Sequence, residues 1–228
     1  MALYAISDLH LDLSRQRGMD RFGNLWIGHT ARLAKAWQES IKEDDVVLIP
    51  GDISWAMRSV DFIPDMEFLH KLPGEKILSR GNHDYFWQSN TKMAQLLPAD
   101  IVALERSFCI RQGYCICAVK GWLTPGASLY ETRRDEKYFI RERGRLTRTL
   151  EQAVRIGLPL LVMMHFPPFA YNGDIGFTDI LEQFKVSICI YGHLHSGAWQ
   201  EQRGGIYNGI SYMLVSADFL EFRPLKVA

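Results

Sequence analysis

The chain has no excess charge of either sign and no long hydrophobic run. Its 228 residues include 26 basic and 26 acidic side chains, a balance that argues against a protein that coats nucleic acid. No apolar run approaches the roughly 20 residues that a membrane-spanning helix needs. The opening residues, Met-Ala-Leu-Tyr-Ala-Ile-Ser-Asp, lack a basic start and a long apolar region. We therefore expect no signal peptide and no membrane association.

Cysteine is also scarce, and the four that occur include no Cys-x-x-Cys pair. Three of them fall in apolar, alternating stretches, where free buried thiols are common. This usage is typical of a reduced, cytoplasmic protein. Internal repeats, linkers and low-complexity tracts are absent as well, so we predict one domain over residues 1–228. With 47% hydrophobic residues, such a chain can bury a substantial core.

Short apolar runs alternate with helical patterns, which is typical of an α/β domain. Strands are predicted at 3–7, 46–49, 77–78, 101–104, 107–110, 115–119, 160–164 and 186–191, with one or two more within 205–222. Helices are predicted over 31–41, 62–72, 89–97, 131–156 and 178–184. Pro64 suits the first turn of the second helix, and Thr178 suits the cap of the last. Residues 14–28 read as a loop.

Five polar clusters each come directly after one of these apolar runs. They contain five of the seven histidines: Asp8-Leu9-His10, Gly51-Asp52, Gly81-Asn82-His83-Asp84, His165 and Gly192-His193-Leu194-His195. Each cluster alone is ordinary turn chemistry. In open α/β sheets, however, ligands bind outside the carboxyl ends of the strands. Oxygen and imidazole donors without thiolate favour Mn, Fe or Zn over a structural cysteine-type zinc site.

In this order, from residue 8 to residue 195, the clusters resemble the motifs of the calcineurin-like metallophosphoesterase superfamily. Compact bacterial phosphohydrolases of that superfamily are the most similar, through Gly51-Asp52-Ile53-Ser54-Trp55-Ala56-Met57 and Tyr191-Gly192-His193-Leu194-His195. A dedicated phosphoprotein phosphatase is disfavoured, because those enzymes carry Arg-Gly after the Gly-Asp motif and Glu in place of Asp84. The resemblance implies a four-layer α/β/β/α sandwich with two mixed β-sheets, the metallophosphatase fold.

The resemblance also implies a site with two divalent or trivalent metal ions, manganese first, with iron or zinc as alternatives. One ion would be held by Asp8, His10, Asp52 and His195, and the other by Asp52, Asn82, His165 and His193. Asp52 would bridge the two. His83 would contact the substrate phosphate or protonate the leaving oxygen, Asp84 would orient His83, and Arg80 would extend the phosphate end of the pocket.

The expected reaction is hydrolysis of a small phosphodiester or phosphomonoester by attack of a metal-bound hydroxide. The alternative is a catalytically inactive binding module that kept the fold. Inactive members typically lose the histidine that follows the asparagine, so the presence of His83 favours an enzyme. Neither the ester class nor the oligomeric state follows from the motifs.

The stretch 131–148 is the most charged part of the chain and has two interpretations. The first is a solvated helix face with paired charges. The second is a rim that binds the phosphorylated substrate through Arg133, Arg134, Arg141 or Arg145, since arginine recognises phosphate bidentately. Trp122 nearby could stack on a base or sugar of that substrate.

Overall fold

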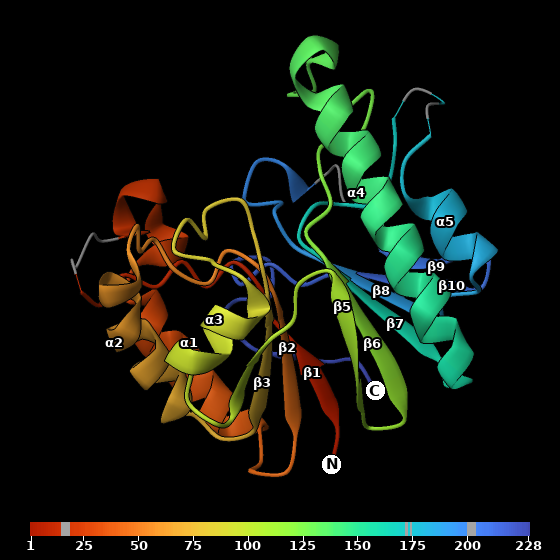
Figure 1. Ribbon diagram of the computed structural model, residues 1–228. Coiled ribbons are helices and arrows are strands. Elements are labelled where there is room, and N and C mark those ends of the chain that lie inside the picture. Colours follow the sequence, from red (N-terminus) through yellow and green to blue (C-terminus); the bar gives the residue numbers. More distant parts are fainter. Residues whose placement is uncertain (15–18, 172, 174, 200–203) are drawn as a thin grey trace.

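Two β-sheets lie face to face, and helices cover the outer face of each sheet (Figure 1). The computed structural model describes residues 1–14, 19–171, 173, 175–199 and 204–228. The predicted four-layer α/β/β/α sandwich is confirmed by this arrangement. Within the described ranges, no helix combines the length and the apolar character that a membrane crossing requires.

Both sheets are mixed, as predicted. The first has the strand order β11 (Leu225–Lys226), β1 (Leu3–Ala5), β2 (Val46–Pro50), β3 (Glu75–Ser79) and β4 (Ile101–Ala103). The second has the order β5 (Ser107–Arg111), β6 (Tyr114–Val119), β7 (Leu160–Met164), β8 (Ile188–Tyr191), β10 (Ile210–Leu214) and β9 (Gly205–Tyr207). Strands β1 to β4 are parallel, as are β6, β7, β8 and β10; β11, β5 and β9 are antiparallel to their neighbours.

Alternating side chains along each inner strand serve two apolar layers. In β2, Val46 and Leu48 belong to the core between the sheets, while Val47 and Ile49 belong to the core beneath the helices. Strand β7 repeats this division. Because both faces of β2 and β7 are buried, these segments of the sequence are continuous apolar runs instead of an apolar and polar alternation.

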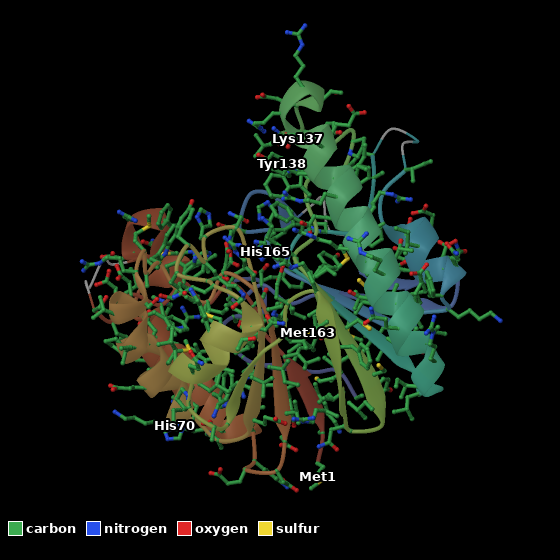
Figure 2. All side chains as sticks on the ribbon, viewed as in Figure 1. Met1, His70, Lys137, Tyr138, Met163 and His165 are labelled. Atoms are coloured by element: carbon green, nitrogen blue, oxygen red, sulfur yellow. The ribbon has the colours of Figure 1, made fainter. Side chains whose placement is uncertain are left out.

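The helices divide between the two sheets. The first sheet carries α1 (His29–Ser40), α2 (Ser59–His70) and α3 (Asn90–Leu96), and the second carries α4 (Thr132–Ala153) and α5 (Thr178–Gln183). Helix α4 continues as η3 (Val154–Ile156) and ends at Gly157, whose φ of 77° is left-handed. The N-terminal part of α4 projects beyond the sheets, and Figure 2 places Tyr138 there, above His165.

Three local predictions differ from the structure. Helix α2 begins at Ser59, so Pro64 lies inside the helix instead of in its first turn. The missing N–H leaves the carbonyl of Val60 without its helical partner, and Val60 is 62% exposed to water. Thr178 is the first residue of α5, and Phe177 occupies the cap position. The predicted loop contains η1 (Met19–Phe22) and η2 (Asn24–Trp26); residues 15–18 lie outside the described residues.

The two sheets meet at the edge where their parallel strands end. Ser7 N donates to Val215 O at 2.7 Å, and Ala217 N donates to Ser7 O at 2.9 Å, which joins the end of β1 to the end of β10. All five polar clusters follow strands that end at this edge. Figure 2 shows His165 there, between the two halves of the molecule.

Candidate metal centre

Four residues of the polar clusters adopt a left-handed backbone conformation. Asp8, His10, Asp52 and His193 have positive φ angles of 57°, 46°, 52° and 71°. A non-glycine residue in this conformation costs on the order of 1 kcal/mol or more, and such strain is typical of functional sites.

Two glycines allow the loops to approach one another. A Cβ atom on Gly81 would overlap Asp52 Oδ1, and a Cβ atom on Gly192 would overlap Asp8 Oδ2 and Ser7 Oγ. The glycines of the Gly-Asn-His-Asp and Gly-His-Leu-His motifs are therefore required by close contact with the two central carboxylates.

Both carboxylates are held by hydrogen bonds from the surrounding loops. Asp8 accepts from Ser7 Oγ, from Ser216 Oγ at 3.2 Å and from His193 N at 3.1 Å. Asp52 Oδ1 accepts from His83 N at 2.8 Å. These contacts leave Asp52 Oδ2 directed toward the histidines.

Asp52 Oδ2 lies between histidines of both sheets. It is 3.5 Å from His165 Nε2, 3.9 Å from His10 Nε2 and 4.0 Å from His83 Nε2. His10 and His83 come from loops of the first sheet and His165 from a loop of the second. One carboxylate oxygen therefore faces both sides of the junction.

Among the described residues, two groups have ligand atoms close enough to share an ion. One is Asp8, His10 and His195, and the other is Asp8, Asp52 and His165; within each, the candidate atoms lie within 4.8 Å of one another. His10 Nε2 is 3.3 Å from His195 Nε2. Asp8, which the family resemblance assigns to one ion, thus falls within both groups.

The contacts of His165 fit a bound cation. Its Nδ1 lies 3.2 Å from the carbonyl oxygen of Pro50. A proton donated there leaves Nε2 with a lone pair, and this atom is 2.7 Å from Asn82 Oδ1. Two lone pairs at this distance repel each other unless a cation accepts both. The donor set, carboxylate, amide oxygen and imidazole without thiolate, suits manganese, iron or zinc.

Burial controls the protonation of the cluster. Burial raises the pKa of Asp8, and burial together with the charges of Asp8 and Asp84 raises the pKa of Asp52 well above its usual range. Burial lowers the pKa of His165 well below its usual value and that of His193 to about 3. The imidazoles of His165 and His193 are therefore neutral, the state in which they bind metal, and a cation would stabilise the crowded carboxylates in their charged form.

The predicted contact between Asp84 and the His83 ring is not formed. The Asp84 carboxylate accepts from the backbone N of Gly81, Asp52, Ile53 and Ser54 at 2.7 to 3.3 Å. The Nδ1 atom of His83 has no hydrogen-bond partner among the described residues. Asp84 is fully buried, and its backbone donors join the loops after β2 and β3.

Asp218 is a site residue that the sequence analysis missed. It follows β10, is 1% exposed, and lies 3.0 Å from His195 Nδ1 through its Oδ1 atom. Its other oxygen accepts from Ser196 N at 3.0 Å. In the sequence it is a single aspartate after an alternating strand, with no neighbouring histidine or glycine motif to mark it.

The structure separates the predicted substrate-binding residues. Trp122 lines a cavity beside His193 and His195. Arg141 and Arg145 line a different groove, where Arg145 pairs with the buried Glu142. Arg134 pairs with Asp135 at 2.8 Å. Arg133 is exposed and lines neither of the cavities beside the histidines. The Nε atom of Arg80 is buried and has no hydrogen-bond partner among the described residues.

Two mixed sheets that bring carboxylates and histidines together at one edge define an α/β protein with a candidate metal centre. The family model of the calcineurin-like phosphoesterases matches residues 1–197, so the chain belongs to this family. The chain is accordingly a metal-dependent phosphoric ester hydrolase.

Solved structures share the fold at low sequence identity. Phosphopantetheinyl hydrolase from Mycobacterium tuberculosis is 18% identical with a TM-score of 0.58, and coverage is 99% of this chain and 95% of that one. Protein AQ665 from Aquifex aeolicus, of unknown function, is 15% identical with a TM-score of 0.53, at 99% and 95% coverage. TT1561 of Thermus thermophilus is 11% identical with a TM-score of 0.55, at 99% and 97% coverage.

One curated relative matches in sequence. The Gene 66 protein of Mycobacterium phage L5 is 37% identical over 78 residues, which are 34% of this chain. The match spans 37% of that relative's length.

Proposed function

We propose that the chain is a dinuclear phosphoesterase that hydrolyses a small phosphorylated molecule. Asp8, His10, Asp52 and His195 would hold one ion, and Asp52, Asn82, His165 and His193 the other. The observation that supports this proposal is the position of Asp52 Oδ2, within 4.0 Å of the Nε2 atoms of His10, His83 and His165. A carboxylate so placed can bridge two ions, and it leaves each side with imidazole donors.

In this proposal, side chains near the ions donate a proton and hold the ligands in position. When bound, the ions supply positive charge at phosphorus and a water of lowered pKa. His83, 34% exposed and beside Trp55, is free to donate from its ring to the phosphate or to the leaving oxygen. Asp84 fixes the backbone from which Asp52, Asn82 and His83 project. Manganese is the first ion to test, with iron and zinc as alternatives.

Lys120 adds a cation at the edge of the site that the sequence analysis did not identify. It follows β6, and its backbone oxygen accepts from His165 N at 3.1 Å. Its Nζ lies 4.2 Å from the centre of the Trp122 ring. A positive charge here would attract an anionic substrate toward the histidines.

The test compares Asp52→Asn with Asp44→Asn, an equivalent change at an aspartate that is 52% exposed and outside the site. We expect wild type and Asp44→Asn to bind about two metal ions per chain and to hydrolyse aryl phosphates with Mn²⁺. Asp52→Asn should bind fewer ions and lose activity. Full metal content in Asp52→Asn, together with an inactive metal-loaded wild type on aryl phosphate mono- and diesters, would refute the proposal.

A further inference from the structure

Two separate cavities open from the candidate metal centre. The Trp122 cavity, of about 300 Å³, is lined among others by Trp122, Leu129, Phe166 and His193. The Trp55 cavity, of about 230 Å³, is lined among others by Phe22, Trp26, Trp55 and His83. Both contact His195 and Ser196, so the centre lies between them.

The Trp55 cavity is built from aromatic rings around His83. Trp55 stacks on His10 with ring centres 4.9 Å apart and lies 4.5 Å from the His83 ring. Trp55 Nε1 donates to Met19 Sδ at 3.0 Å, which fixes the indole plane. Phe22 lies parallel to Trp55, at 6.3 Å between centres and 8° between planes. Flat apolar faces of this kind suit an aromatic or other planar apolar group.

The Trp122 cavity shares His195 with the Trp55 cavity and is also predominantly apolar. Phe166 packs against the His193 ring at 4.3 Å and against Trp122 at 5.6 Å. Trp122 Nε1 donates to Asp135 Oδ1 at 3.2 Å, so the ring is held at the wall of the cavity. His83 does not line this cavity.

We propose, resting on the phosphoesterase function above, that the substrate is a phosphodiester with an apolar or planar group on each ester oxygen. A phosphomonoester has one organic group and would fill one cavity only. A diester places its phosphorus at the metal centre and one group in each cavity. Burial of apolar surface on both sides then favours the diester over a monoester with the same leaving group.

The position of His83 assigns a direction to this diester. The leaving group occupies the Trp55 cavity, because only that cavity is lined by His83. The retained group occupies the Trp122 cavity. Water adds to phosphorus, the bond to the leaving oxygen breaks, and that oxygen takes a proton from His83, which the attacking water restores through solvent. The products are an alcohol and a phosphomonoester bearing the retained group.

The experiment uses metal-loaded enzyme and three 4-nitrophenyl substrates that differ only at the second position: the free monoester, the methyl diester and the phenyl diester. We expect the phenyl diester to exceed the methyl diester in kcat/KM by about tenfold or more, because the second ring is buried. Trp122→Ala and Leu129→Ala should reduce that ratio. Trp55→Ala and Phe22→Ala should lower kcat/KM for both diesters by a similar factor and leave the phenyl-to-methyl ratio unchanged.

Exposed lining residues keep the test independent of folding. Leu129 and Phe22 are 69% and 52% exposed, so their replacement spares the core if either tryptophan variant fails to fold. Ile140→Ala, at a residue that is 61% exposed and outside both cavities, is the matched control. We expect diphenyl phosphate to bind more tightly than phenyl phosphate, as measured by quenching of tryptophan fluorescence.

The outcomes separate this inference from the function on which it rests. The diester assignment would be wrong if the monoester were cleaved faster than both diesters, or if the methyl and phenyl diesters had similar kcat/KM values. Either result would still be consistent with a phosphoesterase. If Phe22→Ala abolishes the preference for the phenyl diester and Leu129→Ala keeps it, the assignment of the leaving group to the Trp55 cavity is wrong. Inactivity toward all three substrates with a full metal complement would contradict the proposed function itself.

Discussion

The carboxylate of Asp218 lies 3.0 Å from Nδ1 of His195, although the two residues follow different strands, β10 and β8. A proton held between them leaves Nε2 of His195 with a lone pair, and that atom is 3.5 Å from Asp8 Oδ1. Burial lowers the pKa of His195, but the Asp218 hydrogen bond and the charges of Asp8 and Asp218 together raise it above its ordinary value. Asp218 therefore orients the ring of His195 and makes it more basic.

Replacing Asp218 with asparagine should weaken metal binding without removing a ligand. Loss of a partner that orients a ligand histidine typically costs about 10- to 100-fold in affinity. The measurement is a metal titration against a competing chelator, with Asp44→Asn as the control. In the metal-free protein, the pKa of His195 measured by NMR should fall in Asp218→Asn. Unchanged affinity and an unchanged pKa would show that the contact has no influence on His195.

Asp84→Asn should lower the stability of the protein through the loss of hydrogen bonds to the backbone. The carboxylate accepts from four backbone N–H groups, and an amide would direct its own NH₂ at one or more of them. We expect the free energy of unfolding to fall by about 2 kcal/mol, because buried donors lose their acceptor. Denaturant titration measures this change. A stable variant whose His83 pKa has shifted would instead support the orienting role that the sequence suggested.

Glu105 should make the stability of the protein depend on pH. Burial, followed by the charge of Glu142, raises its pKa from 4.5 to about 7. The folded state then holds this proton more tightly than the unfolded chain does. The stabilising contribution is complete below about pH 4.5 and is lost as the pH rises through about 7.

Glu105→Gln removes this titration. The difference in unfolding free energy between the variant and wild type should increase with pH across that window, by at most about 1.4 kcal/mol per pH unit. Urea titrations at several pH values measure it. A difference that stays constant from pH 4.5 to 7 would exclude a raised pKa at Glu105.

Two glycine substitutions should have opposite effects. In Gly192→Ala the new Cβ would overlap Asp8 and Ser7, so we expect lower stability and weaker metal binding. In Gly144→Ala, within α4, the new Cβ meets only Arg148 Nη1, at 3.4 Å. Alanine there should raise the free energy of unfolding by about 0.5–1 kcal/mol through its helix propensity. Thermal melting of both variants checks this, and a stable Gly192→Ala that keeps its metal would contradict the close contact.

The sequence was most informative where a strand and its polar end are adjacent. The runs before Asp8, Asp52 and His165 are buried on both faces, so their apolar character marks the strands without reference to the rest of the fold. The ends of α3 and α4 also carry residues typical of their positions: Ser89 caps α3 by accepting from Lys92 N, and Gly157 closes the helical segment. The prediction that Pro64 lies in the first turn of its helix was wrong, because α2 tolerates an internal proline where the carbonyl of Val60 can reach water.

The sequence was least informative where partners come from different strands. Asp218 meets His195 only because β10 pairs with β8. Asp84 is adjacent to His83 in the chain, yet its carboxylate is occupied by the loop after β2. Trp26 and Trp55 contact the His10 ring only because the loops of the first sheet fold against it. None of these contacts has a signature in local composition or spacing.

The sequence by itself determined the ligand chemistry, the positions of the strands and the family, because each depends on residues that are neighbours in the chain. The tertiary structure alone decided which atoms meet. Asp52 Oδ2 faces His10 and His165 because two separately paired sheets pack face to face and end at one edge. The same packing leaves two apolar cavities that share His195, and the proposed substrate class rests on them because the motifs do not specify it.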